Sequence, residues 1–158
     1  VEEGEDNEEY VQEQFEDKLI EMLDGLNQKS SQGRINCIQT LRKALIKKYV
    51  PNFVRERHFT ICDSIEKSLK KGGGLEKSAA AELAPVISLQ LGEEDAGEMV
   101  DKTLRPLLIT AACDASVGVG ARAKVNNFVF RVFQLFNLHT ATWNSRMKVH
   151  CVDLFSHV

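Results

Sequence analysis

The chain has 158 residues, of which 43% are hydrophobic and 27% are charged. These values are typical of a single globular domain that can bury a core. No apolar run reaches the roughly 18 residues that a membrane span needs. The acidic beginning, VEEGEDNEEY, resembles neither a signal peptide nor a transit peptide, so we expect no membrane association.

The net charge of −3 conceals a strong asymmetry along the chain. Residues 1–24 carry 11 acidic side chains and one basic one, which gives −10. Residues 25–71, called the basic block below, carry 11 basic and three acidic side chains, which gives +8. The acidic arm is either simply disordered or competes with a polyanion for the basic block.

The chain begins with a predicted disordered acidic arm over residues 1–7, because high charge and few apolar side chains leave little to bury. From Glu8 to about Leu26 the apolar residues follow helical spacing. Ser30 or Ser31 is suited to cap the next helix, since a serine hydroxyl can accept a hydrogen bond from the first turn.

Proline and glycine delimit the elements that follow. The second helix ends before Pro51, and the third ends at Gly72, which we expect to be a left-handed C-cap. The third helix covers residues 52–71. Further helices are predicted over residues 75–91 and 98–113, and from about residue 121. Pro85 and Pro106 fall inside two of them, so a kink is expected at Pro85.

The predicted helices form pairs that recur at a constant spacing. The turns within the pairs centre on Ser31, Gly74 and Val117, each 43 residues after the last. A cation follows each turn, namely Arg34, Lys77 and Arg122. A period near 43 with two helices per unit is typical of HEAT and armadillo repeats.

We therefore predict an all-α fold, an armadillo/HEAT-like helical-repeat solenoid over residues 8–122 with a C-terminal helical segment over residues 123–158. An irregular helical bundle with accidental spacing is the alternative.

Motifs for catalysis and metal binding are missing from the sequence. It contains no GxSxG, HExxH or Walker A motif, and KKGGGLEKS follows a helix instead of the strand that a phosphate loop needs. His150, Cys151 and His157 lack a fourth zinc ligand. The cysteines, which are far apart, favour a reduced intracellular protein; they are Cys37, Cys62, Cys113 and Cys151. We expect no enzyme activity, cofactor, metal or small-molecule substrate.

Basic side chains concentrate in the second and third predicted helices. The candidates are Arg42, Lys43, Lys47 and Lys48 in the second helix, and Arg55, Arg57, Lys67, Lys70 and Lys71 in the third. The first four are spaced to align on one face, away from the core seam. If the two helices pack side by side, their cations merge into one patch that suits a phosphate backbone. A solvated face is the alternative.

Five segments stand in an order that matches a known family. They are LDGLNQKSSQGR (23–34), ERHFTICDSIEKSLKKG (56–72), LQLG (89–92), TLRPLL (103–108) and DASVGVGAR (114–122). Together they resemble the conserved front half of the interferon-related developmental regulator family, over about residues 15–122. The second segment is the most specific. That family is similar to armadillo and HEAT proteins in fold, in agreement with the period.

The resemblance changes after Arg122. NNFVFRVFQL (126–135) resembles a motif near the C-terminal end of the family, except at Phe130 and Arg131, and NSRMKV (144–149) resembles the basic segment after it more weakly. We hypothesise that a middle portion is absent and that residues near 123–126 join two distant segments. One continuous, divergent sixth helix is the alternative.

The resemblance implies regulation and not catalysis. Members are described as transcriptional coregulators and as proteins that sit on translationally inactive ribosomes. It implies a cytoplasmic factor that binds rRNA and ribosomal proteins and represses translation by occluding the mRNA and tRNA path. The alternative is a nuclear scaffold that binds corepressor proteins.

Phosphate contacts would come from the nine candidate cations above and from a basic tail. The tail residues are Arg131, Arg146 and Lys148, interleaved with Phe128, Phe133 and Trp143. These aromatic side chains serve either as stacking surfaces for bases or as core.

Overall fold

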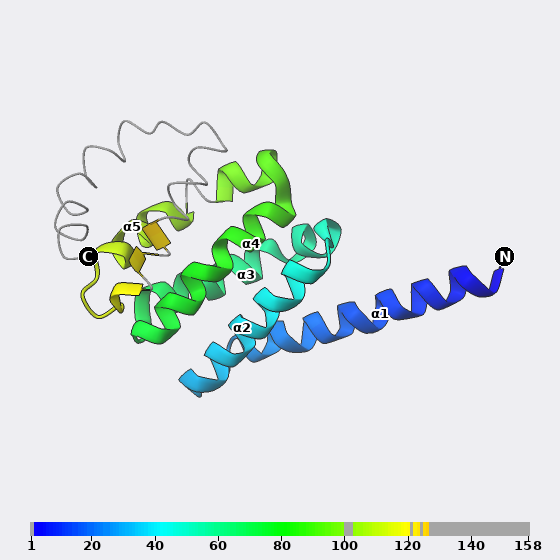
Figure 1. Cartoon of the computed structure of the whole chain (residues 1–158), viewed down its shortest axis with the longest axis horizontal. Helices are drawn as coiled ribbons and strands as arrows, with labels where there is room; N and C mark the ends of the chain where they lie inside the picture. The colour runs from blue at the N-terminus through cyan, green and yellow to red at the C-terminus, as the bar shows by residue number, and fades with distance from the viewer. Residues whose placement is uncertain (1, 100–102, 121, 124, 127–158) are drawn as a thin grey trace.

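The computed structural model describes residues 2–99, 103–120, 122, 123, 125 and 126, and it is mostly helical over this range (Figure 1). The helices are α1 (Glu2–Gly25), α2 (Ser31–Lys47), α3 (Pro51–Lys71), α4 (Gly74–Met99) and α5 (Arg105–Cys113). Residues 119, 120, 122, 123, 125 and 126 are also helical, where a sixth helix was predicted. The described residues include no strand, which confirms the all-α class.

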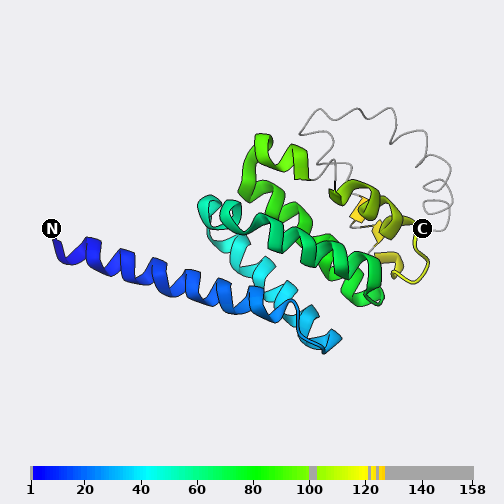
Figure 2. The same ribbon diagram turned by 180° about the vertical axis from the view of Figure 1, so that it is seen from behind.

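The helices stack as successive hairpins in two layers. Within the hairpins, α1 packs against α2 and α3 against α4. Between hairpins, α2 packs against α4 while α3 contacts both α1 and α5, so that α1, α3 and α5 form one layer and α2 and α4 the other. Figures 1 and 2 show this arrangement from opposite sides. It confirms a solenoid-like helical repeat.

The core lies between the two layers. Apolar side chains three and four residues apart point inward from each helix and pack against those of its neighbours. The largest fully buried side chains are Leu19, Leu41, Val54, Ile61, Ile65, Leu83, Ile87, Leu104, Leu108 and Val117. The core therefore draws on all five helices and on the turn after α5.

The helix α1 is longer than the sequence suggested. It begins at Glu2, so residues 2–7 are helical and not the disordered arm that was expected. Glutamate is a good helix former, and acidic residues near a helix N-terminus complement the helix dipole. Figures 1 and 2 show that α1 projects well beyond the rest of the molecule.

The predicted serine cap is confirmed, whereas the predicted glycine cap is wrong. Ser30 is the N-cap of α2, and its hydroxyl accepts a hydrogen bond from the Gly33 N–H at 3.2 Å. Gly72 has φ −70° and ψ 157°, which is extended and not left-handed. Its N–H donates to the Ser68 carbonyl oxygen at 2.9 Å and so ends α3 without a positive φ.

The helix α4 leaves helical geometry at Gly92 and not at Pro85. Gly92 has a φ of 79°, a conformation that glycine adopts without steric cost. The helix resumes and continues to Met99, although no helix was predicted between residues 91 and 98. Pro106 lies in the first turn of α5, where its missing N–H is harmless.

Across the described residues, every helix is too short or too polar to cross a membrane.

Candidate nucleic-acid interface

The four candidate cations of α2 do not share one face, contrary to the prediction. Lys43 and Lys47 are exposed. Arg42 is half-buried and approaches the Glu82 carboxylate of α4 at 4.0 Å. Lys48, just after α2, lies over the Phe15 ring of α1 at 5.0 Å from its centroid. Neighbouring helices on either side thus take up two of the four cations.

Two arginines lie at the start of α3. One is exposed to solvent, and the other contacts side chains of the same helix. Arg55 is exposed and donates a hydrogen bond to the Asn52 side chain at 3.2 Å. Arg57 is half-buried, with its guanidinium 4.2 Å from the centroid of the Phe53 ring. It also pairs with Glu56 at 3.1 Å, so less of its charge is available to a ligand.

The end of α3 carries three exposed lysines. Lys67 pairs with Asp63 at 2.6 Å, and Lys70 pairs with Glu66, each one helical turn away. Exposed pairs of this kind contribute at most about 1 kcal/mol, so an anionic ligand can readily displace them. Lys71 forms no ion pair within the described part of the chain.

These cations form two groups and not the single patch that was expected. The helix α2 packs mainly against α1 and α4, whereas α3 packs mainly against α4 and α5. The two helices therefore belong to opposite layers. Lys43 and Lys47 belong to the layer of α2 and α4. The layer of α1, α3 and α5 carries the other exposed cations, which are Arg55, Lys67, Lys70 and Lys71.

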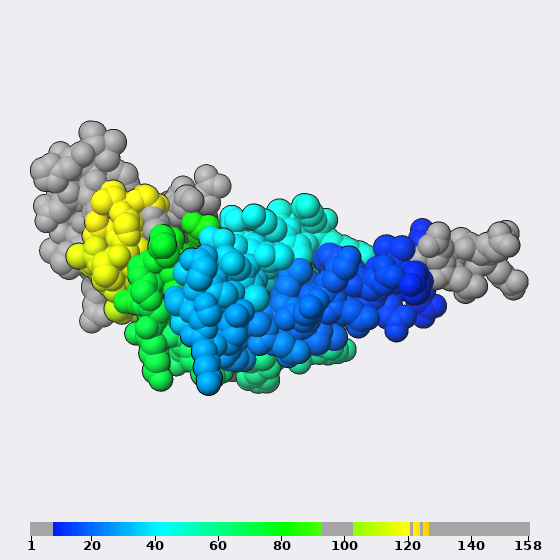
Figure 3. All heavy atoms as spheres, turned by 90° about the horizontal axis from the view of Figure 1, so that it is seen from below, coloured from blue at the N-terminus to red at the C-terminus, as the bar shows by residue number. Residues whose placement is uncertain are grey.

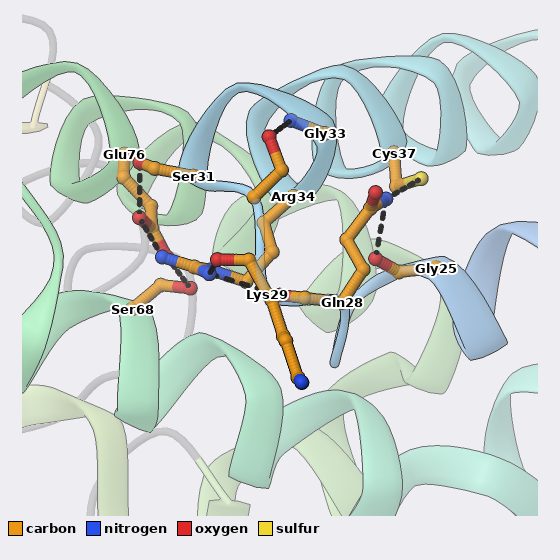
Figure 4. Close-up of polar contacts among 10 residues, drawn as sticks. Gly25, Gln28, Lys29, Ser31, Gly33, Arg34, Cys37, Ser68 and Glu76 are labelled. Carbon is orange, nitrogen blue, oxygen red and sulfur yellow. Dashed lines mark hydrogen bonds and ion pairs between the residues drawn. The ribbon is translucent and has the colours of Figure 1, made fainter.

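A buried ion-pair cluster ties the first turn to the second (Figure 4). The Glu76 carboxylate, 2% exposed, accepts two hydrogen bonds of 2.8 Å from the Arg34 guanidinium. It also accepts hydroxyl hydrogen bonds from Ser31 at 2.8 Å and Ser68 at 3.1 Å. The Arg34 bonds, followed by those of the serines, lower the pKa of Glu76, while burial opposes them.

The next turn is held in a similar way. The Lys77 ammonium donates to the Asp114 carboxylate at 2.5 Å, and Asp114 also accepts from the Ser116 hydroxyl and backbone N–H. The hydrogen bond from Lys77 contributes most to lowering the pKa of Asp114. From the sequence, Arg34 and Lys77 were identified only as the cations that follow the turns of the repeat. Their 43-residue spacing was the signal that both form the ion pair at their turn.

No candidate metal centre is found among the described residues. They contain no group of three or more histidine, cysteine or acidic side chains that could hold a metal ion. Burial raises the pKa of the Cys62 thiol to about 12, with a smaller contribution from Glu66, so this thiol is unreactive at neutral pH. His150, Cys151 and His157 lie outside the described residues, as do the predicted tail cations Arg131, Arg146 and Lys148.

Comparison with known proteins identifies relatives that share the repeat region. Interferon-related developmental regulator 2 of Mus musculus is 38% identical over 116 residues, which is 73% of this chain and 26% of that protein. Interferon-related developmental regulator 1 of Homo sapiens and that of Mus musculus are each 40% identical over the same lengths. The chain thus spans about a quarter of the length of these relatives.

The family model described as interferon-related developmental regulator (IFRD) matches residues 1–127. This range includes the five segments and both ion-pair clusters, and it extends beyond the 15–122 range of the resemblance. Residues 128–158 lie outside the match, so a join near 123–126 stays a prediction. Since the match covers most of the sequence, the chain belongs to the interferon-related developmental regulator family.

Proposed function

We propose that the protein is a non-enzymatic, ribosome-associated factor that binds inactive ribosomes and represses translation by occluding the mRNA and tRNA path. The observation that carries the proposal is the basic block on a rigid helical frame. Six of its nine candidate cations are exposed, namely Lys43, Lys47, Arg55, Lys67, Lys70 and Lys71. Phosphate contacts from exposed lysine and arginine release condensed counterions, which supplies most of the affinity for RNA.

The packing of the helices supports a positioning role for this surface. The Arg34–Glu76 and Lys77–Asp114 pairs connect successive hairpins, so the cations of α2 and α3 keep a set spacing. Contacts of this type read the shape and charge of folded RNA and not its sequence. Occlusion of the mRNA path would fall to residues 123–158, whose Arg131, Arg146 and Lys148 provide further phosphate contacts.

The test is co-sedimentation with purified vacant ribosomes. The variant Lys43→Glu/Lys47→Glu reverses the α2 group, and Lys67→Glu/Lys70→Glu reverses part of the α3 group. At least one of them is expected to lose more than 10-fold in affinity, and wild-type binding should weaken steeply with salt. Lys18→Glu, at an exposed lysine of α1 outside the basic block, is the charge-reversal control and should co-sediment as wild type does. Full co-sedimentation of both double variants would contradict the proposal.

A second candidate function is a coregulator scaffold that binds corepressor proteins. Exposed apolar side chains favour it: Ile46, Tyr49 and Leu89 are 58%, 68% and 65% exposed. Apolar anchors of this kind dominate protein interfaces and depend little on ionic strength. Loss of partner binding in Tyr49→Ser/Leu89→Ser, with ribosome binding unchanged, would favour the scaffold.

A further inference from the structure

A cavity of about 230 Å³ opens between the α1–α2 connection and the C-terminal half of α3. Asn27 and Arg34 line it from one side, and Ser64, Lys67 and Lys71 line it from the other. The Glu76 carboxylate reaches it from the start of α4. Two hairpins thus contribute to its walls, and none of the comparisons assigns it a role.

The acidic group of the cavity is already satisfied. Both oxygens of Glu76 accept from Arg34, and each accepts one further hydroxyl hydrogen bond, from Ser31 or Ser68. Arg34 in turn donates from Nη1 to the carbonyl oxygens of Gln28 and Lys29, each at 2.9 Å (Figure 4). This pair is therefore neutral as a unit and has little capacity left for a ligand.

The cations on the other side are available. Lys71 is exposed, and its ammonium has no hydrogen-bond or ion-pair partner among the described residues, nor has the side-chain amide of Asn27. Lys67 pairs only with Asp63, and both side chains of that pair are more than half exposed. The cavity therefore offers two ammonium groups and an amide, and its net charge is positive.

We propose that this cavity binds a single phosphate group, supplied by the backbone of an RNA strand. Its volume is below the roughly 300–1,000 Å³ of sites that enclose a whole small molecule, so it suits one group of a larger ligand. Two ammonium groups and an amide match the oxygens of a phosphate. This inference rests on the proposed function, because the choice of RNA as the source does.

Cations just outside the cavity favour an extended ligand over a free anion. Lys29 adjoins the lining residue Gln28, and its side chain points away from the Glu76 cluster (Figure 4). Lys70 adjoins Lys71 and is exposed. Flanking phosphates of one strand could reach these two lysines, whereas free phosphate in the cavity would leave them unused.

The test follows the backbone amide signals of the isotope-labelled chain by NMR at constant ionic strength. The probes are a ten-nucleotide single-stranded RNA, inorganic phosphate and polyglutamate. We expect the RNA to shift the signals of Asn27, Lys71 and Gly72 first, and to bind about 10-fold more weakly to Asn27→Ala/Lys71→Met. Lys71→Arg should retain binding, and Lys18→Met, at an exposed lysine of α1 outside the basic block, is the matched control.

Three results would overturn the inference. They are unchanged RNA affinity in Asn27→Ala/Lys71→Met, equal shifts with polyglutamate, and shifts with inorganic phosphate but not with RNA. The site and the proposed function fail separately. If RNA binding depends on Lys71 but the chain does not co-sediment with ribosomes, the proposed function fails and the site stands. If the double cavity variant co-sediments and binds RNA as wild type does, only the site fails.

Discussion

Among single residues, Glu76 joins two successive hairpins through polar contacts. It lies in the first turn of α4 and accepts hydrogen bonds from side chains of α2 and α3. A carboxylate at 2% exposure would be costly if unpaired, so its four hydrogen bonds are a condition for burying it. Arg34, Ser31 and Ser68 therefore matter through Glu76 and not as surface polar groups.

The stability of the protein should fall in acid. The pKa values of Glu76 and Asp114 are lowered in the folded state, so the unfolded chain binds more protons as the pH drops. Their contribution is present above the unfolded pKa values, near pH 4, and is lost as the pH falls through the lower folded values. Urea unfolding at pH 7, 5, 4 and 3 measures this.

Glu76→Gln is the diagnostic variant for the acid prediction. We expect it to be less stable than wild type by about 1–3 kcal/mol at pH 7, and to lose less stability between pH 5 and pH 3. Glu66→Gln, in an exposed pair, is the control and should change stability by less than about 1 kcal/mol. Identical pH profiles for wild type and Glu76→Gln would refute the assignment.

At the scale of elements, Gln90 joins α4 to the end of α2. This side chain is 4% exposed, and its amide nitrogen donates to the carbonyl oxygens of Leu45 at 2.8 Å and Lys48 at 2.9 Å. Its oxygen accepts from the Val50 N–H at 2.8 Å. One glutamine thus satisfies three backbone groups where the chain passes from α2 to α3, which explains a polar residue in the core.

Replacing Gln90 by leucine should cost about 2–3 kcal/mol, because buried backbone groups lose their partners. Hydrogen exchange of the Val50 amide should also become faster than in wild type. Gln39→Leu, the same substitution at an exposed position of α2, is the matched control. Equal stability of the two variants would show that water or neighbouring groups replace the glutamine.

The contact between the second and third turns depends on the absence of a side chain at Gly74. A β-carbon there would lie 2.2 Å from the Ser116 carbonyl oxygen, whereas one at Gly73 would meet nothing within 4 Å. Gly74→Ala should therefore destabilise by about 1–3 kcal/mol although alanine favours helix. Gly73→Ala should change stability by less than about 1 kcal/mol. Thermal unfolding of both variants tests this.

At the scale of the whole molecule, residues about one repeat apart in the sequence contact each other because successive hairpins stack. Several long-range hydrogen bonds join residues about one repeat apart: 42 for Arg34–Glu76, 45 for Ser31–Glu76 and 40 for Val50–Gln90. In Figure 3 the turns near Ser31, Gly74 and Val117, coloured light blue, green and yellow, follow one another across one face. The layers that result separate the cations of α2 from those of α3.

This separation predicts a shallow salt dependence for a short RNA. A ten-nucleotide single strand bound at the cavity can engage the four exposed cations of α3 and Lys29, whereas the two exposed cations of α2 lie in the other layer. With a slope of about −0.7 per phosphate contact, log K against log salt should not be steeper than about −3.5. Fluorescence anisotropy from 50 to 300 mM salt measures this slope. A value of about −5, as seven contacts would give, would mean that one strand reaches both layers.

The sequence by itself determined where most of the helices lie, the serine cap of α2 and the repeat period. Apolar spacing specified each buried face, Ser30 marked the start of α2, and the 43-residue recurrence indicated stacked hairpins. The buried faces and the cap depend on neighbours within one or two helical turns, and the recurrence is a spacing along the chain, so all three can be read without knowing the packing. Disorder was predicted for residues 1–7 from their high charge and few apolar side chains. The helix propensity of glutamate was given less weight, and residues 2–7 are helical.

Only the tertiary structure decided which cations are available to a ligand. Arg42, Lys48 and Arg57 have the same local pattern as Lys43 and Lys47, yet Glu82, Phe15 and Phe53 take up part of their charge. Two of these partners come from other helices. Phe15 lies 33 residues before Lys48, and Glu82 lies 40 residues after Arg42. The cavity beside Lys71 likewise exists only where two hairpins meet. Local spacing cannot specify such contacts, because they depend on how the core packs distant helices together.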